Sequence, residues 1–253
     1  MMAREASIVL TSATLQTAFA EAYRSLRANL GVDGGMQGAR ALLVASGGPG
    51  EGKSTTVANL GILMAQAGQR VVLVDADFRR PCLHRLLPAS GNGHRVTGVD
   101  GFWQRDGADP VRRGLSDLIA GTASYVEVAT PVDGTENLVM VPTGTIPPNP
   151  AELLASPRMR SVIADLCDHA DVVLLDSPPC SLYSDAQELT RVTDGILYVL
   201  RSGRPGPVNH VRALKQLQQG KARLIGIVMN QVEARAAGYS RPYPGGAPRL
   251  GRP

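Results

Sequence analysis

The sequence predicts an α/β protein in which a doubly wound, mostly parallel sheet carries helices on both faces. A glycine-rich turn at 47–54 joins an apolar run, 41–45, to a stretch with helical periodicity that begins near residue 57. Strands alternating with helices form a doubly wound sheet. Runs that do not alternate with polar residues are typical of parallel strands covered on both faces. Five further runs of this kind lie at 70–77, 138–141, 171–177, 196–200 and 224–229.

The glycine-rich turn reads GGPGEGKS and matches the phosphate-binding pattern G-x-x-x-x-G-K-[ST], the P-loop. Glycines let backbone N–H groups converge on an anion, and the helix that follows adds its positive N-terminal end. Lys53 is expected to reach the β- and γ-phosphates, and the Ser54 hydroxyl to bind Mg²⁺. The sequence therefore predicts a nucleoside triphosphate site formed by Gly48, Pro49, Gly50, Glu51, Gly52, Lys53, Ser54 and Thr55.

Two of the predicted strands end in carboxylates. Asp75 and Asp77 close the run RVVLVDAD, and Asp176 closes DVVLLDS in a Walker B pattern. Ligands of doubly wound sheets bind beyond the carboxyl ends of the strands, so these side chains should meet Lys53 there. We expect Asp176 and Asp75 to act on the metal and Asp77 to accept a proton from the attacking hydroxyl or water. The alternative is that Asp75 or Asp77 only caps the next turn.

An amphipathic helix is predicted at 14–30. Its apolar stripe has the spacing i, i+4, i+7, i+11 and consists of Leu15, Phe19, Ala22 and Leu26. A second stripe, spaced by three, consists of Glu21, Arg24 and Arg27. Geometry alone favours a solvated face with an ordinary ion pair for this second stripe.

The length of 253 residues fits one large α/β domain, placed at 1–235 with a long loop at 82–113, followed by a flexible tail at 236–253. Three cysteines without CxxC spacing favour reduced thiols in a cytosol. No apolar run approaches the roughly 18 residues of a membrane span, and no secretory leader is evident. The net charge of +4 is too small to predict nucleic-acid binding.

Four stretches together resemble the bacterial tyrosine kinases, or BY-kinases, which are P-loop autokinases of capsule and exopolysaccharide export. These stretches are EAYRSLR at 21–27, GGPGEGKST at 47–55, VVLVDADFRRP at 71–81 and VVLLDSPP at 172–179. The loop PTGTIPPNPAELL and the strand end IGIVMN also look like the family. The resemblance covers roughly residues 15–232.

The resemblance implies an ATP-dependent protein-tyrosine autokinase. It implies that Lys53 and Ser54 bind phosphate and Mg²⁺, and that Asp75, Asp77 and Asp176 form the metal and catalytic cluster. Asn230 matches the position that contacts adenine. Glu21, Arg24 and Arg27 match the motif through which family members pack into rings. Tyr239 and Tyr243 of the tail would be the phosphoacceptors, entering the active site of a neighbouring subunit.

The same resemblance implies a cytoplasmic protein held at the inner face of the membrane by a transmembrane polysaccharide co-polymerase, or chain-length adaptor. A phosphatase is an expected partner, and nucleic acid is not. Two features depart from the family: the tail has only two tyrosines, and the stretch 82–113 is unusually long.

Two other functions fit the P-loop. Partition and division-site ATPases share the sheet but carry an extra lysine early in the P-loop, where this chain has Gly48. A non-catalytic nucleotide switch that acts through assembly alone also fits, because the P-loop residues serve binding and catalysis alike.

Overall fold

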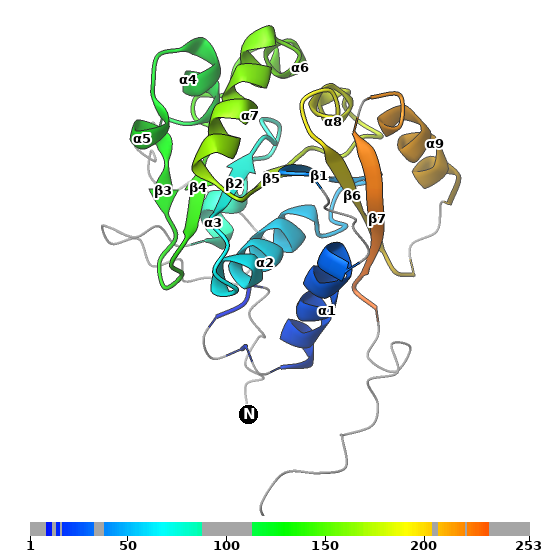
Figure 1. Ribbon diagram of the computed structural model, residues 1–253. Coiled ribbons are helices and arrows are strands. Elements are labelled where there is room, and N and C mark those ends of the chain that lie inside the picture. The colour runs from blue at the N-terminus through cyan, green and yellow to red at the C-terminus, as the bar shows by residue number, and fades with distance from the viewer. Residues whose placement is uncertain are drawn as a thin grey trace, which may run out of the picture.

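The strands form one seven-stranded sheet in the order β3-β4-β2-β5-β1-β6-β7 (Figure 1). The computed structural model describes residues 9–11, 14–15, 17–32, 38–87, 113–203, 207–220 and 222–232. All strand pairs are parallel except β3 with β4. The strands are β1 (Ala41–Ser46), β2 (Val71–Asp75), β3 (Thr130–Pro131), β4 (Leu138–Val141), β5 (Val172–Asp176), β6 (Gly195–Arg201) and β7 (Arg223–Asn230).

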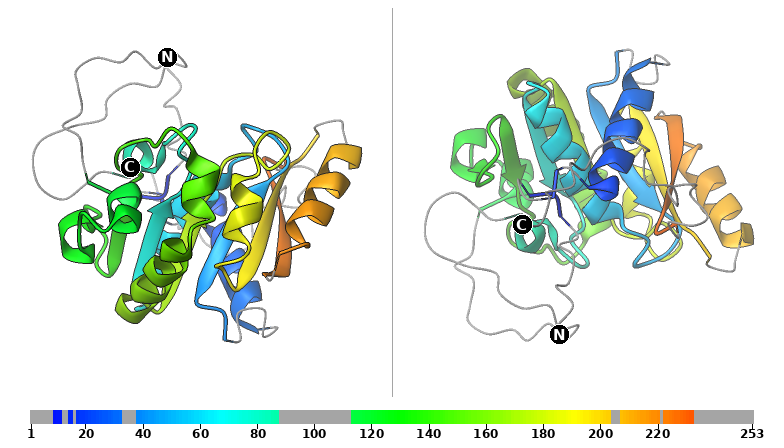
Figure 2. Two further views of the ribbon diagram at one scale, coloured as in Figure 1. Left: turned by 90° about the horizontal axis from the view of Figure 1, so that it is seen from above. Right: turned by 90° about the horizontal axis from the view of Figure 1, so that it is seen from below.

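Helices cover both faces of the sheet, so the predicted doubly wound fold is confirmed (Figure 2). One face carries α1 (Ala18–Val32), α2 (Lys53–Gln66) and α3 (Leu83–Leu86). The other carries α4 (Leu115–Ala120), α5 (Tyr125–Val128), α6 (Pro150–Leu154), α7 (Pro157–His169), α8 (Asp185–Leu189) and α9 (Pro207–Leu217). Strand β1 lies between β5 and β6, where the winding of the chain reverses, and ligands of such sheets bind at this point.

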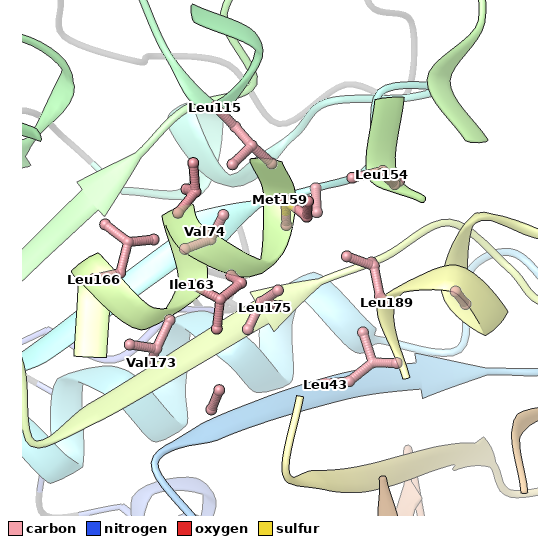
Figure 3. Close-up of a cluster of buried hydrophobic side chains, with 14 of the residues drawn as sticks. Leu43, Val74, Leu115, Leu154, Met159, Ile163, Leu166, Val173, Leu175 and Leu189 are labelled. Carbon is pink, nitrogen blue, oxygen red and sulfur yellow. The ribbon is translucent and has the colours of Figure 1, made fainter. Parts of the chain in front are cut away.

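Side chains of each central strand alternate between two hydrophobic cores. Leu43 of β1 points into the core under α7, whereas its neighbours Leu42 and Val44 point into the core under α2. In Figure 3, Val74 of β2 lies near Met159 of α7, and Leu43 of β1 lies near Leu189 of α8, within one hydrophobic cluster that also includes Leu115 of α4. Full burial of a Leu or Val side chain stabilises a fold by about 1.5–3 kcal/mol, so these cores fix the strand ends that carry the polar residues.

Strand β7 corrects the expectation that every apolar run is buried. Ile227 and Met229 are 51% and 62% exposed, because β7 is the last strand of the sheet and, among the described strands, pairs with β6 alone. The predicted loop 82–113 contains the short helix α3, and residues 88–112 lie outside the described part of the chain.

Helix α1 begins at Ala18 instead of residue 14 and ends at Val32. Its predicted apolar stripe is confirmed in part. Leu15 and Leu26 pack against the core. Phe19, which is 38% exposed, and Ala22 do not, and Ala20, Tyr23 and Leu30 are buried instead. The helix is rotated so that the aromatic ring of Tyr23 packs into the core with α2. No helix within the described residues is both long and apolar enough to cross a bilayer.

Candidate active site

The predicted P-loop residues, 48–55, run from the end of β1 into the first turn of α2. Two of its glycines have left-handed backbone angles, with φ of 71° at Gly50 and 95° at Gly52. Only glycine adopts such angles without strain, and they turn the loop back toward the helix start. A side chain at Gly52 would also collide with the amide of Asn230, which lies against the loop. The loop conformation therefore requires glycine at 52.

Lys53 is nearly buried, and its Nζ donates a hydrogen bond to the hydroxyl of Ser46 at 3.1 Å. An ammonium group has three donors, and within the described residues this is its one hydrogen bond. The charge of Lys53 also lowers the pKa of Asp176, so the ammonium group lies near the carboxyl end of β5. Phosphate oxygens would satisfy both the free donors and the helix end.

The three predicted carboxylates lie together at the carboxyl ends of neighbouring strands. Asp75 of β2 is paired in register with Asp176 of β5, and both are fully buried. Asp77 follows two residues after Asp75 and is 7% exposed. The structure thus brings Asp75, Asp77 and Asp176 to one edge, next to the end of β1 that carries the P-loop.

Burial and the charges of neighbouring carboxylates raise the pKa values of Asp75 and Asp176. Burial is the main cause that raises the pKa of Asp75 well above its usual range, and the charge of Asp176 adds to it. Burial likewise raises the pKa of Asp176 to about 6, although Lys53 and the Ser54 hydroxyl oppose the shift. Two buried carboxylates so close together need a cation to be ionised at low cost.

Both residues of the Asp-x-Asp pair also cap the turn that follows, as the capping alternative requires. Asp75 uses both oxygens, accepting from the backbone N–H groups of Asp77, Cys82 and Leu83. Asp77 accepts from the N–H groups of Arg79 and Arg80 through Oδ1 alone. Within the described residues its Oδ2 takes no hydrogen bond, so Asp77 keeps an oxygen that can receive a proton.

The residues present fit a nucleotide-bound Mg²⁺. Oδ2 of Asp176 is buried without a well-formed hydrogen bond from the described residues, while the nearby Ser54 hydroxyl lowers its pKa. No group of three or more His, Cys, Asp or Glu side chains in the described chain encloses a metal by itself. Mg²⁺ in nucleotide sites keeps most of its water and uses one or two protein ligands plus phosphate. Ser54 and Asp176 meet that requirement, with Asp75 beside them.

Asn230 lies at the end of β7, where its amide donates to the backbone carbonyl of Glu51 at 3.0 Å. The residue assigned to adenine by resemblance is therefore placed at the rim of the P-loop. Three other residues near the loop were not predicted from the sequence. Cys82, Tyr198 and His210 have no motif around them, and only the folded sheet brings them there.

The residues predicted to join subunits lie on α1, away from this edge. Arg24 forms an ion pair with Glu21 at 3.0 Å and also donates to the carbonyl of Leu15. Arg27 donates to the carbonyl of Leu63 in α2 at 2.6 Å. Tyr239 and Tyr243 lie outside the described residues.

A P-loop at the switch point of a doubly wound sheet, with carboxylates on two adjacent strands, defines a P-loop nucleotide-binding domain. The family model "CobQ/CobB/MinD/ParA nucleotide binding domain" matches residues 42–240. Among curated proteins, the tyrosine-protein kinase YwqD of Bacillus subtilis is 33% identical over 83% of this chain and 80% of its own length. The chain belongs to the bacterial tyrosine-protein kinase branch of this nucleotide-binding family.

Two further relatives support this placement. The tyrosine-protein kinase wzc of Salmonella typhimurium is 32% identical over 87% of this chain, a match that covers 28% of the longer relative. The solved kinase domain of the Escherichia coli tyrosine kinase ETK superposes with a TM-score of 0.75 at 27% identity, covering 96% of this chain and 88% of that one.

Proposed function

We propose that this chain is an ATP-dependent protein-tyrosine kinase that phosphorylates tyrosines of its own C-terminal tail, Tyr239 and Tyr243, in neighbouring copies. One observation carries the proposal: the buried oxygen of Asp176 without a well-formed bond lies beside Ser54 and Lys53, at a P-loop edge shared with Asp75 and Asp77. The named kinases among its relatives favour this function over the partition-type ATPase.

Each residue has a role in this proposal. ATP supplies the γ-phosphoryl group, and Mg²⁺ neutralises the charge that develops on its oxygens. The P-loop N–H groups and Lys53 hold the phosphates, and Ser54, Asp176 and Asp75 hold the metal. The phenolic oxygen of the tyrosine forms a bond to the γ-phosphorus, and the bond from that phosphorus to the leaving ADP breaks. Oδ2 of Asp77 receives the proton of the tyrosine hydroxyl in this step. Asn230, at the rim of the loop, would contact the adenine.

The proposal extends to assembly. By analogy with the family, Glu21, Arg24 and Arg27 of α1 would join copies into a ring. A transmembrane chain-length adaptor of polysaccharide synthesis would hold the ring at the inner membrane face, and a phosphatase would reverse the modification. The chain would then regulate capsular or extracellular polysaccharide export.

Autophosphorylation tests the function directly. The purified protein is incubated with Mg·ATP and probed with an antibody against phosphotyrosine, beside Lys53→Met, Asp77→Asn and Tyr239→Phe/Tyr243→Phe. We expect label in the wild type and none in the double Tyr variant or in Lys53→Met. Asp77→Asn should slow labelling by roughly 10²- to 10⁴-fold, the usual contribution of a general base.

Two results would favour the alternatives. Rapid phosphate release without phosphotyrosine indicates an ATPase, and nucleotide binding with neither product indicates an assembly switch.

A matched control is Tyr183→Phe, since Tyr183 is a described tyrosine outside the tail that contacts Arg79 through its ring. Loss of label in that variant, with the tail intact, would mean that the tail is not the acceptor.

A further inference from the structure

Three polar side chains from separate elements meet behind the P-loop. Glu51 belongs to the loop itself and is 2% exposed. His210 comes from α9, and its Nε2 lies 3.5 Å from Oε1 of Glu51. The other ring nitrogen, Nδ1, lies 3.2 Å from the hydroxyl of Tyr198, a fully buried residue of β6. The P-loop is therefore linked to α9 and β6 through one imidazole.

The imidazole of His210 lies between the Tyr198 hydroxyl and the Glu51 carboxylate. The Tyr198 hydroxyl forms a hydrogen bond with Nδ1 of His210, which leaves Nε2 on the side of the Glu51 carboxylate. The second carboxylate oxygen of Glu51, Oε2, is buried and takes no hydrogen bond from the described residues. His210 is thus the side chain that places a polar ring nitrogen next to the buried carboxylate of the P-loop.

The backbone of the loop lies directly on the same pair. A Cβ atom added to Gly47 would lie 2.7 Å from Nδ1 of His210 and 2.9 Å from the hydroxyl of Tyr198. On the far side, the Asn230 amide holds the Glu51 carbonyl at 3.0 Å. Side chains from β6, α9 and β7 therefore hold one side of the P-loop. The other side of the loop is the one that would bind the phosphates of the nucleotide.

We propose that His210 is a positioning residue for the P-loop, which sets the nucleotide affinity by holding Glu51 in its buried place. The proposal rests on the nucleotide site proposed above. Without the imidazole, the Glu51 carboxylate is left buried and uncompensated, and the loop moves to bring it into water. The phosphate-binding N–H groups then lose their preset arrangement.

Direct binding of a fluorescent ADP analogue with Mg²⁺ tests the proposal. His210→Ala should raise the Kd roughly five- to tenfold, as expected for loss of a contact to a charged group. His210→Gln, which keeps a donor near the position of Nε2, should recover most of that loss. Adding Glu51→Gln to His210→Ala should recover part of the affinity, because the uncompensated charge is then gone.

Kinetics separate positioning from simple packing. In autophosphorylation the KM for ATP of His210→Ala should rise by the same factor as the Kd, with kcat nearly unchanged. Asn209→Ala, an exposed position on the same helix, is the matched control and should keep the wild-type Kd. Tyr198→Phe removes only the hydroxyl that orients the ring and should raise the Kd roughly two- to threefold, which keeps the test usable if His210→Ala does not fold.

Three outcomes overturn the proposal while leaving the function intact: a wild-type Kd in His210→Ala, equal losses in the Ala and Gln variants, or a double variant weaker than His210→Ala. Failure of the wild type to bind any nucleotide would instead refute the proposed function.

Discussion

At the scale of one residue, burial of the Asp176 carboxylate lowers the stability of the folded protein. The carboxyl is fully buried, and its pKa is raised to about 6 by burial, against an ordinary value of 3.8. Between these two pH values the folded chain binds more protons than the unfolded chain, so this group makes stability fall as the pH rises from about 4 to about 6. Above pH 6 the cost is complete, and a bound cation would relieve it.

Asp176→Asn should therefore stabilise the nucleotide-free protein while abolishing kinase activity. At pH 8 we expect a gain of about 1–2 kcal/mol in the free energy of unfolding, disappearing near pH 4, where the native carboxyl is protonated. Urea unfolding at the two pH values measures it.

Asp171→Asn is the matched control for this test. Asp171 precedes the same strand, but a hydrogen-bonded ion pair with Arg70 lowers its pKa, so its replacement should destabilise at pH 8. An Asp176→Asn variant whose stability difference is the same at both pH values would contradict the assigned cause.

At the scale of an element, α1 combines two roles on one surface. Arg27 donates to the Leu63 carbonyl of α2, and Arg24 pairs with Glu21. The Arg24–Glu21 pair is exposed enough to add little to stability by itself. The part of the surface that remains open is therefore mainly Glu21 and the outer side of Arg24.

The triple substitution Glu21→Ala/Arg24→Ala/Arg27→Ala should lower the oligomer mass of the protein to that of a single subunit. Light scattering after size exclusion measures the mass, with Asn29→Ala, an exposed residue of the same helix, as control. Because Arg27 also bonds α2, thermal unfolding of the triple variant is recorded beside it. An unchanged mass in a wild type that does assemble would exclude α1 from the interface.

The elements were predictable wherever a residue pattern reports directly on burial. The central strands β1, β2 and β5 lie close to their predicted ranges, since strands buried on both faces have uninterrupted apolar sequences. The orientation of α1 was not predictable, because Phe19 and Tyr23 are both aromatic and only packing on α2 selects Tyr23 for the core. Edge position, which exposes Met229, is a property of the sheet order and has no local signal.

The same division holds for the site. Lys53, Ser54 and the three carboxylates stand in short motifs whose spacing follows from their chemistry. His210 and Tyr198 lie near the loop only because the fold brings α9 and β6 next to it, so no local sequence pattern predicts their place in the site. The Asp-x-Asp carboxylates also cap the turn after β2. They do so because the backbone beyond the strand places N–H groups, such as those of Arg79 and Leu83, within hydrogen-bond distance.

At the scale of the whole molecule, a nucleotide would add contacts between segments that follow three different strands of the sheet. In the proposed site, its phosphates would contact the loop after β1, and its metal would contact the ends of β5 and β2. Mg·ADP at about 100 times its Kd should stabilise the fold by roughly 2.7 kcal/mol and raise Tm by several degrees.

Removal of the metal tests this linkage. EDTA should abolish most of the increase in Tm, and Lys53→Met should show little increase in either condition. An equal increase with and without Mg²⁺ would mean that the carboxylates take no part in binding.

The place of β1 in the sheet has a consequence for how the protein is made. Although β1 is the first strand to leave the ribosome, its neighbours β5 and β6 are among the last, and Asn230 follows later still. The nascent P-loop thus has no sheet to rest on until nearly the whole domain has been translated. Pairings between segments so distant in sequence form slowly, so we expect the proposed nucleotide site to form only at the end of synthesis.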